Sequence, residues 1–146
     1  MELKVAFYRG STGALHKLIG AWTKSVHTHV ELVLPEGARL GIRPWKEGVV
    51  KCWEEIDDEP HNWDHVPYIV TPDQLNRIND FYNETQGQPY DWVGVVGSHV
   101  LPYRVQQSGR WFCSQWVGRA LDLSGIAPVP KEHELNPGRL FRYLHR

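Results

Sequence analysis

The sequence predicts an α+β fold in which an antiparallel sheet packs against helices. Residues 28–34 and 39–43 are strand-like runs on either side of the turn sequence Pro35-Glu36-Gly37-Ala38. This pattern predicts a hairpin, and the two strands of a hairpin pair in antiparallel. Residues 71–87 and 111–121 instead carry apolar side chains at spacings of three and four, which is typical of helices that pack on a core.

The first elements are a strand and a short helix. Residues 3–8 suit a strand, and the sequence Arg9-Gly10-Ser11-Thr12-Gly13 breaks that strand with two glycines and a Ser/Thr cap candidate. In residues 14–23 the apolar side chains recur at helical spacing, which predicts one stripe against the core. These side chains are Leu15, Leu18, Ile19 and Trp22.

The middle of the chain predicts more strands. Pro44 interrupts the return arm of the hairpin, which favours a bulge or a sheet edge there. A further strand is expected over residues 49–53. Residues 54–64 are acidic and rich in Pro, His and Asn, so we expect a surface loop, and residues 65–70 predict the next strand.

Two longer helices follow. Thr71-Pro72-Asp73-Gln74 provides a cap, a proline in the first position and an acidic residue in the first turn, and Gly87 is the expected end. The second helix, residues 111–121, is expected to end near Gly125 and Pro128. We predict polar loops between these elements and a last short helix around residues 138–143.

Size and charge limit the possible functions. The 146 residues, 41% of them hydrophobic, suit a single domain spanning residues 1–146. Sixteen basic and seventeen acidic side chains nearly cancel, so no summed field favours nucleic acid or an anionic membrane surface. No run approaches the roughly 20 apolar residues that span a bilayer. The start Met-Glu-Leu-Lys lacks the basic lead-in of a signal peptide, which predicts a cytoplasmic protein, or a phage-encoded one that acts in or from the host cell.

Cys113 is the strongest candidate for chemistry. With only two cysteines, Cys52 and Cys113, no disulfide framework is expected. A cysteine in the first turn of a helix lies where backbone N–H groups and the macrodipole favour the thiolate. The same N–H groups can stabilise the oxyanion formed when a thiolate attacks a carbonyl. The alternative is an ordinary buried cysteine.

A thiolate nucleophile needs a base, and a strand holds an imidazole more accurately than a loop does. His29 meets this condition, and Glu31, two residues further along the same strand face, is placed to orient its ring. The alternatives are a half-buried histidine, since the chain has eight, and a solvated carboxylate on a half-exposed strand. Other carboxylates, among them Glu47, Glu54 and Asp91, remain unranked.

Three of these segments together resemble a known family. They are Thr28-His29-Val30-Glu31-Leu32-Val33, Gln88-Pro89-Tyr90-Asp91-Trp92 and Trp111-Phe112-Cys113-Ser114-Gln115-Trp116-Val117. Their order is similar to the circularly permuted branch of the NlpC/P60 papain-like superfamily, in which the histidine precedes the cysteine. The opening Phe7-Tyr8-Arg9-Gly10 also resembles that family. The resemblance spans roughly residues 5 to 125 and is best to versions from phage and bacterial genomes.

The resemblance implies a papain-like fold, with Cys113 as nucleophile and His29 as base in a cysteine peptidase or amidase. Peptidoglycan-type peptide amides are the commonest substrate of the family. Many relatives carry a polar orienting residue on the strand after the histidine, where this chain has Leu40-Gly41-Ile42-Arg43. Either Glu31 or another group therefore takes that role, or activity is reduced or lost.

Other site types have less support in the sequence. Histidines are frequent, but no Cys-x-x-Cys or His-Glu-x-x-His spacing indicates a metal site. Neither a phosphate-binding Gly-x-x-x-x-Gly-Lys motif nor a dinucleotide fingerprint is present, so no cofactor is expected.

Two further functions remain open. One is a non-catalytic module whose aromatic groove binds a peptide, glycan or acyl chain. Its walls would come from Trp45, Trp53, Trp63, Trp92 and Trp111. The other is an acyltransferase, which forms the same thioester and differs only in whether water or another nucleophile attacks it.

Overall fold

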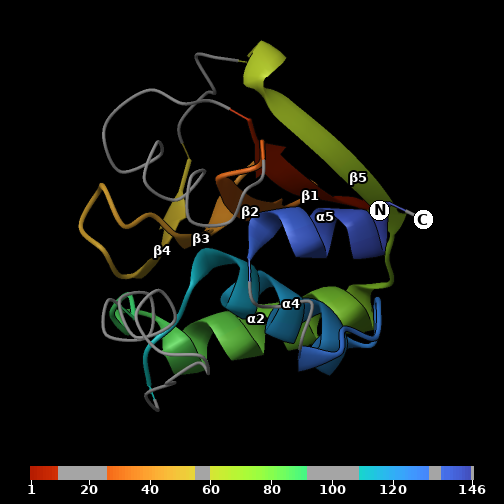
Figure 1. Cartoon of the computed structure of the whole chain (residues 1–146). Coiled ribbons are helices and arrows are strands. Elements are labelled where there is room, and N and C mark those ends of the chain that lie inside the picture. Colours follow the sequence, from red (N-terminus) through yellow and green to blue (C-terminus); the bar gives the residue numbers. More distant parts are fainter. Residues whose placement is uncertain (10–25, 55–59, 92–108, 132–135, 146) are drawn as a thin grey trace.

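The computed structural model describes residues 1–9, 26–54, 60–91, 109–131 and 136–145. These residues form a five-stranded antiparallel sheet, with the strand order β4-β3-β2-β1-β5, and three α-helices (Figure 1). The strands are β1 (Glu2–Tyr8), β2 (His29–Val33), β3 (Arg39–Ile42), β4 (Val50–Trp53) and β5 (Trp63–Ile69). The helices are α2 (Pro72–Thr85), α4 (Cys113–Ser124) and α5 (Pro137–Leu144), and a short 3-10 turn, η1 (Pro60–Asn62), precedes β5. The α+β class and the antiparallel sheet are as predicted.

β1 lies in the interior of the sheet, between β2 and β5. Its Val5 is opposite Leu32 of β2 and Val66 of β5, and all three side chains are buried in the hydrophobic core. The predicted strands over residues 3–8 and 28–34 are confirmed to within one residue at each end.

The predicted hairpin is also confirmed. The Leu34 N–H donates to the Ala38 carbonyl at 2.8 Å, and Gly37 takes the left-handed conformation (φ 100°) that the turn requires. The expectation of a sheet edge near Pro44 is wrong for β3, which pairs with a neighbour on both sides. Pro44 lies just after β3, in the turn that leads to the edge strand β4.

β5 begins two residues before the predicted strand. Trp63 and Asp64 were expected in a surface loop, but they pair with Tyr8 and Phe7 of β1. Pairing with β1 therefore extends β5 to Trp63, although the composition of this segment favours a loop.

The helices begin and end close to the predicted positions. Thr71 caps α2 as expected: its Oγ1 accepts from the Gln74 N–H at 3.2 Å, and its own N–H donates to Gln74 Oε1 at 3.0 Å. α4 begins at Cys113, two residues after the predicted start, because Trp111 forms a β-bridge with Tyr90.

α4 ends at Ser124, and the residue that caps it, Gly125, has a left-handed φ of 76°. The short C-terminal helix is confirmed as α5. The predicted helix over residues 14–23 and most of the predicted polar loop between the two longer helices lie outside the described residues.

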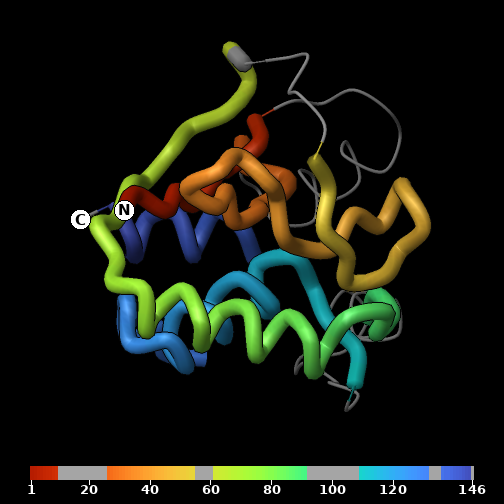
Figure 2. Tube along the Cα trace, turned by 180° about the vertical axis from the view of Figure 1, so that it is seen from behind, coloured from red at the N-terminus to blue at the C-terminus, as the bar shows by residue number. Residues whose placement is uncertain are grey.

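α2 and α4 lie side by side and form a helical layer against the sheet (Figures 1 and 2). The fully buried Trp116 joins them: its ring stacks on Phe81 at 5.3 Å between centroids, and its Nε1–H donates to Thr85 Oγ1 at 2.9 Å. α4 also contacts β2 and β3. The helical layer therefore determines where Cys113, the first residue of α4, lies against the sheet.

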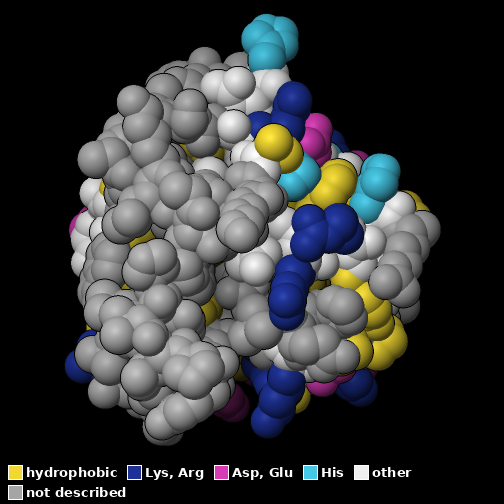
Figure 3. All heavy atoms as spheres, in the orientation of Figure 1, with side chains coloured by type: hydrophobic (Ala, Val, Ile, Leu, Met, Phe, Trp, Pro, Cys, Tyr) yellow, Lys and Arg dark blue, Asp and Glu magenta, His cyan; other side chains and the backbone are white. Residues whose placement is uncertain are grey.

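The described surface carries local charge despite the small net charge. In the view of Figure 3, Lys and Arg side chains run down the middle of the described surface, and few acidic side chains are visible. None of the helices in the described parts of the chain combines the length and hydrophobicity needed to cross a bilayer.

Candidate active site

Cys113 is the first residue of α4. The residue before it, Phe112, is extended, and the Phe112 N–H donates to Gln115 Oε1 at 3.3 Å, which fixes the chain at the helix start. The predicted position of Cys113 in the first helical turn is therefore confirmed. The residue is buried, with 3% of its surface exposed.

His29 is the first residue of β2 and is fully buried. Its Nε2–H donates to Glu31 Oε1 at 2.8 Å, and its ring also interacts with the Cys113 side chain. Burial alone would lower the pKa of His29. Hydrogen bonding and charge interactions with Cys113 and Glu31 more than offset burial and raise the pKa of His29 from 6.5 to about 9.

The two ring nitrogens of His29 have different surroundings. Because Nε2 is bonded to Glu31, Nδ1 is the nitrogen left for the sulfur of Cys113. Nδ1 is buried and has no hydrogen-bond partner among the described residues. The ring is thus bonded to Glu31 through Nε2, while its interaction with Cys113 does not meet the geometry of a hydrogen bond.

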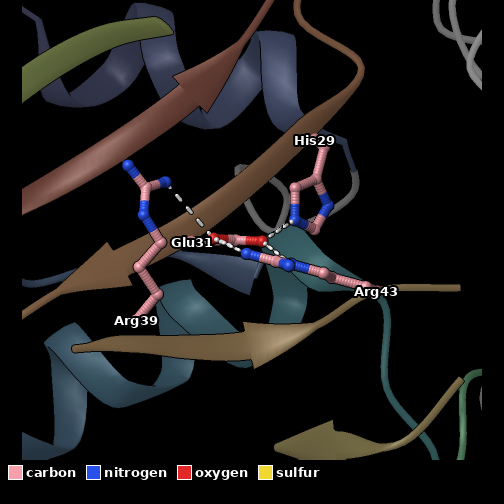
Figure 4. Close-up of polar contacts among 4 residues, drawn as sticks. All are labelled: His29, Glu31, Arg39 and Arg43. Carbon is pink, nitrogen blue, oxygen red and sulfur yellow. Dashed lines mark hydrogen bonds and ion pairs between the residues drawn. The ribbon is translucent and has the colours of Figure 1, made fainter. Parts of the chain in front are cut away.

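Glu31 is fully buried, which corrects the alternative of a solvated carboxylate on a half-exposed strand. Three cationic or potentially cationic side chains hold it, from β2, from β3 and from the turn after β3 (Figure 4). Burial raises the pKa of this carboxyl, but hydrogen bonds and charges of His29 and Arg43 lower it from 4.5 to about 2. Glu31 is therefore ionised at neutral pH.

Two arginines complete the cluster. Arg43 donates from Nε to Glu31 Oε1 at 2.5 Å and from Nη2 to Oε2 at 3.2 Å. Arg39 donates from Nη1 to Oε2 at 3.4 Å. Each guanidinium also lies over an indole ring, at 4.3 Å from Trp53 for Arg43 and 4.6 Å from Trp63 for Arg39.

The sequence reasoning missed both arginines. Arg43 stands at the end of the segment where the resemblance implies a polar orienting residue, and it donates to Glu31. The strand period gave a usable signal. Because side chains alternate along a strand, Arg39, Gly41 and Arg43 continue one face of β3, and Leu40 lies on the other face. Leu40 is opposite Leu32 of β2, so the face with the two arginines is the one that carries Glu31.

Aromatic side chains surround His29. The Trp45 ring meets the His29 ring edge to face, with the centroids 4.6 Å apart, and Trp45 is 43% exposed. Trp63 lies 6.3 Å from His29. Trp111 packs on Phe81 and belongs to the helical layer. Trp92 lies outside the described residues.

The other histidine of the segment has different neighbours. His27 Nε2 bonds to Asp64 Oδ2 of β5 at 2.8 Å, and the ring packs against Phe7 and Phe141. His27 therefore joins β5 and α5 to the start of β2. No group of three or more His, Cys, Asp or Glu within the described ranges is arranged to bind a metal ion.

The second cysteine lies in a different environment. Cys52 is half-buried on the edge strand β4, and burial together with the charges of Glu54 and Glu36 raises the pKa of its thiol. This environment favours the neutral thiol.

The arrangement combines a sulfur at a helix start, an imidazole that interacts with it and an ionised carboxylate hydrogen-bonded to the imidazole. In chemical terms this is a nucleophile, a proton carrier and a group that orients the carrier. No protein-family model matches the chain, and no curated protein matches it.

Proposed function

We propose that this protein is a cysteine hydrolase of the peptidase or amidase type, with a permuted papain-like NlpC/P60 arrangement. One observation supports the proposal above all: the His29 ring is hydrogen-bonded to the buried carboxylate of Glu31 and also interacts with the Cys113 side chain. A histidine with that pair of neighbours can take a proton from the thiol and stay oriented while it does so.

The first half of the proposed reaction forms a thioester. Because the pKa of His29 is raised to about 9, His29 holds a proton on Nδ1 at neutral pH, and the reactive partner is the thiolate of Cys113. The sulfur attacks the carbonyl carbon of an amide or ester, which forms the S–C bond and an oxyanion. Backbone N–H groups in the first turn of α4 stabilise that oxyanion. The C–N or C–O bond then breaks, and the leaving group takes the proton from His29.

The second half releases the acyl group. Water gives a proton to His29 and attacks the thioester carbonyl. The S–C bond breaks, the acid product leaves, and the proton from His29 returns to the sulfur. If an alcohol or amine attacks in place of water, the same residues carry out acyl transfer, so the hydrolase and acyltransferase readings share this chemistry.

The substrate is a peptide or another acyl compound. The resemblance to phage and bacterial versions of the family makes a cell-wall peptide the first substrate to test, with the enzyme acting in or from the bacterial cell. No nucleic acid, cofactor or metal takes part in the proposed reaction.

Access to the sulfur is the condition that the proposal must meet. Because Cys113 is only 3% exposed, neighbouring side chains must move before a carbonyl can reach it. The same burial favours the second candidate function, a non-catalytic binding module with aromatic walls that include Trp45. Reactivity of the thiol separates the two functions.

The test measures alkylation of each cysteine with iodoacetamide between pH 5 and pH 9, followed by mass spectrometry. Cys113 is expected to react well below pH 8.5, the ordinary pKa of a thiol, and Cys52 only near or above that pH. Cys52→Ala is the control and should keep the reactive thiol, whereas Cys113→Ala should lose it.

The second measurement is incubation with p-nitrophenyl acetate and with peptidoglycan fragments. An acyl adduct on wild type that is absent from Cys113→Ala supports the hydrolase. Slow, equal labelling of both thiols, with no adduct from any of these substrates, contradicts it and favours the binding module.

A further inference from the structure

We infer that Arg43 is a positioning residue, which holds the Glu31 carboxylate in the one orientation that keeps the His29 ring directed at Cys113. This inference rests on the proposed function and adds a fourth residue to its machinery. Arg43 acts through Glu31 and is not expected to touch the substrate.

The geometry distinguishes Arg43 from its neighbour. Arg43 binds both carboxylate oxygens of Glu31, at 2.5 and 3.2 Å, and the oxygen of the shorter bond also accepts from His29. Arg39 reaches only the other oxygen, at 3.4 Å. A two-point contact with a planar guanidinium restrains the plane of a carboxylate, whereas a single long contact does not.

The need for a permanent positive charge follows from the reaction itself. His29 carries a positive charge only while it holds the proton from Cys113, and it becomes neutral when the leaving group takes that proton. The buried Glu31 would then lose its charged partner on β2. Arg43 remains charged throughout, so the carboxylate stays ionised and continues to accept the Nε2–H of His29.

Arg43 is itself held firmly. Its guanidinium lies over the Trp53 ring at 4.3 Å, and its carbonyl accepts the N–H groups of Lys46 and Gly48, both at 3.1 Å. Glu31 is faced by His29 on its own strand and by Arg39 and Arg43 from β3 and the following turn. Among these three, Arg43 makes the only two-point contact.

The test compares the two arginines with matched variants, using p-nitrophenyl acetate and measuring the rate of Cys113 acetylation. Arg43→Lys keeps the charge and loses the planar fork, and we expect a loss of about 10-fold, rising to about 100-fold in Arg43→Ala. Arg39→Lys is expected to cost clearly less than Arg43→Lys, because Arg39 makes only one, longer contact with the Glu31 carboxylate. Urea unfolding of each variant identifies any that does not fold. If Arg43→Ala is unstable, the comparison of Arg43→Lys with Arg39→Lys tests the inference.

Two readouts separate positioning from a general structural role. In a Glu31→Gln background, Arg43→Lys should change the rate by no more than about twofold, because its effect passes through the carboxylate. In Arg43→Ala the acid limb of the pH–rate profile should move to higher pH, because the pKa of Glu31 rises when its cation is removed.

The outcomes are distinct from those of the proposed function. Equal losses in Arg43→Lys and Arg39→Lys, or a full effect of Arg43→Lys in the Glu31→Gln background, would overturn the inference while leaving a reactive Cys113. No acetylation of wild-type Cys113 would overturn the proposed function and the inference with it.

Discussion

At the scale of single residues, Glu31 decides the character of the site. A carboxylate without partners would be strongly disfavoured in the interior, but here one histidine and two arginines surround it. From the sequence, Glu31 could be either the group that orients the His29 ring or a solvated carboxylate on a half-exposed strand. Only the positions of Arg39 and Arg43 explain why it is buried and ionised, and these residues come from another strand and the turn that follows it.

The first prediction concerns the pH dependence of stability. Because the pKa of Glu31 is about 2 in the folded protein and 4.5 ordinarily, the unfolded chain binds more protons between these values. The stabilisation from ionised Glu31 is therefore complete above pH 4.5 and is lost as the pH falls toward 2. Between pH 5.5 and pH 3 the free energy of unfolding of wild type should fall by about 2 kcal/mol more than that of Glu31→Gln.

Urea unfolding at several pH values measures this difference, because all other carboxyl groups titrate in both proteins. Parallel curves for wild type and Glu31→Gln would mean that the folded state does not hold Glu31 in its charged form.

At the scale of elements, β3 leaves room for the buried carboxylate. Gly41 lies beside Glu31, and a Cβ at this position would be 3.5 Å from Glu31 Cγ, an ordinary contact distance. A larger side chain would extend from there into the space of Glu31. The buried Glu31 side chain of β2 thus has room because Gly41, its neighbour on β3, has no side chain.

The second prediction uses this contact. Gly41→Ala should keep the rate of Cys113 acetylation within about twofold of wild type. Gly41→Val should displace the Glu31 carboxylate and lower that rate by about 10-fold. Acetylation by p-nitrophenyl acetate measures both, with urea unfolding to confirm that each variant folds. A valine variant as active as the alanine variant would show that the position of Glu31 does not matter for the reaction.

At the scale of the whole molecule, the layer formed by α2 and α4 carries Cys113 to the sheet. The layer depends on a buried polar contact as well as on apolar packing. Trp116 donates its indole N–H to Thr85, whose hydroxyl in turn donates to the Phe81 carbonyl at 2.8 Å. The start of α4 is therefore fixed by contacts made further along the two helices.

The third prediction tests this contact. Thr85→Val keeps the shape of the side chain but leaves the indole N–H of Trp116 unpaired in the interior, so it should lower the free energy of unfolding by about 1–3 kcal/mol. Thr85→Ser keeps the hydroxyl and should have a smaller effect. Urea unfolding measures both variants, and equal losses would point to the lost methyl contacts and not to the hydrogen bond.

Four features could be predicted from the sequence: the α+β class, the hairpin, the capped start of α2 and the place of Cys113 at the beginning of a helix. These features depend on local patterns of a few residues: strand alternation, turn residues and helix caps. The tertiary structure alone decided that Glu31 is buried, that Arg43 holds it and that β5 begins at Trp63. Each of these follows from residues of different elements that meet only after folding, because pairing between strands and burial of charge are properties of the assembled sheet.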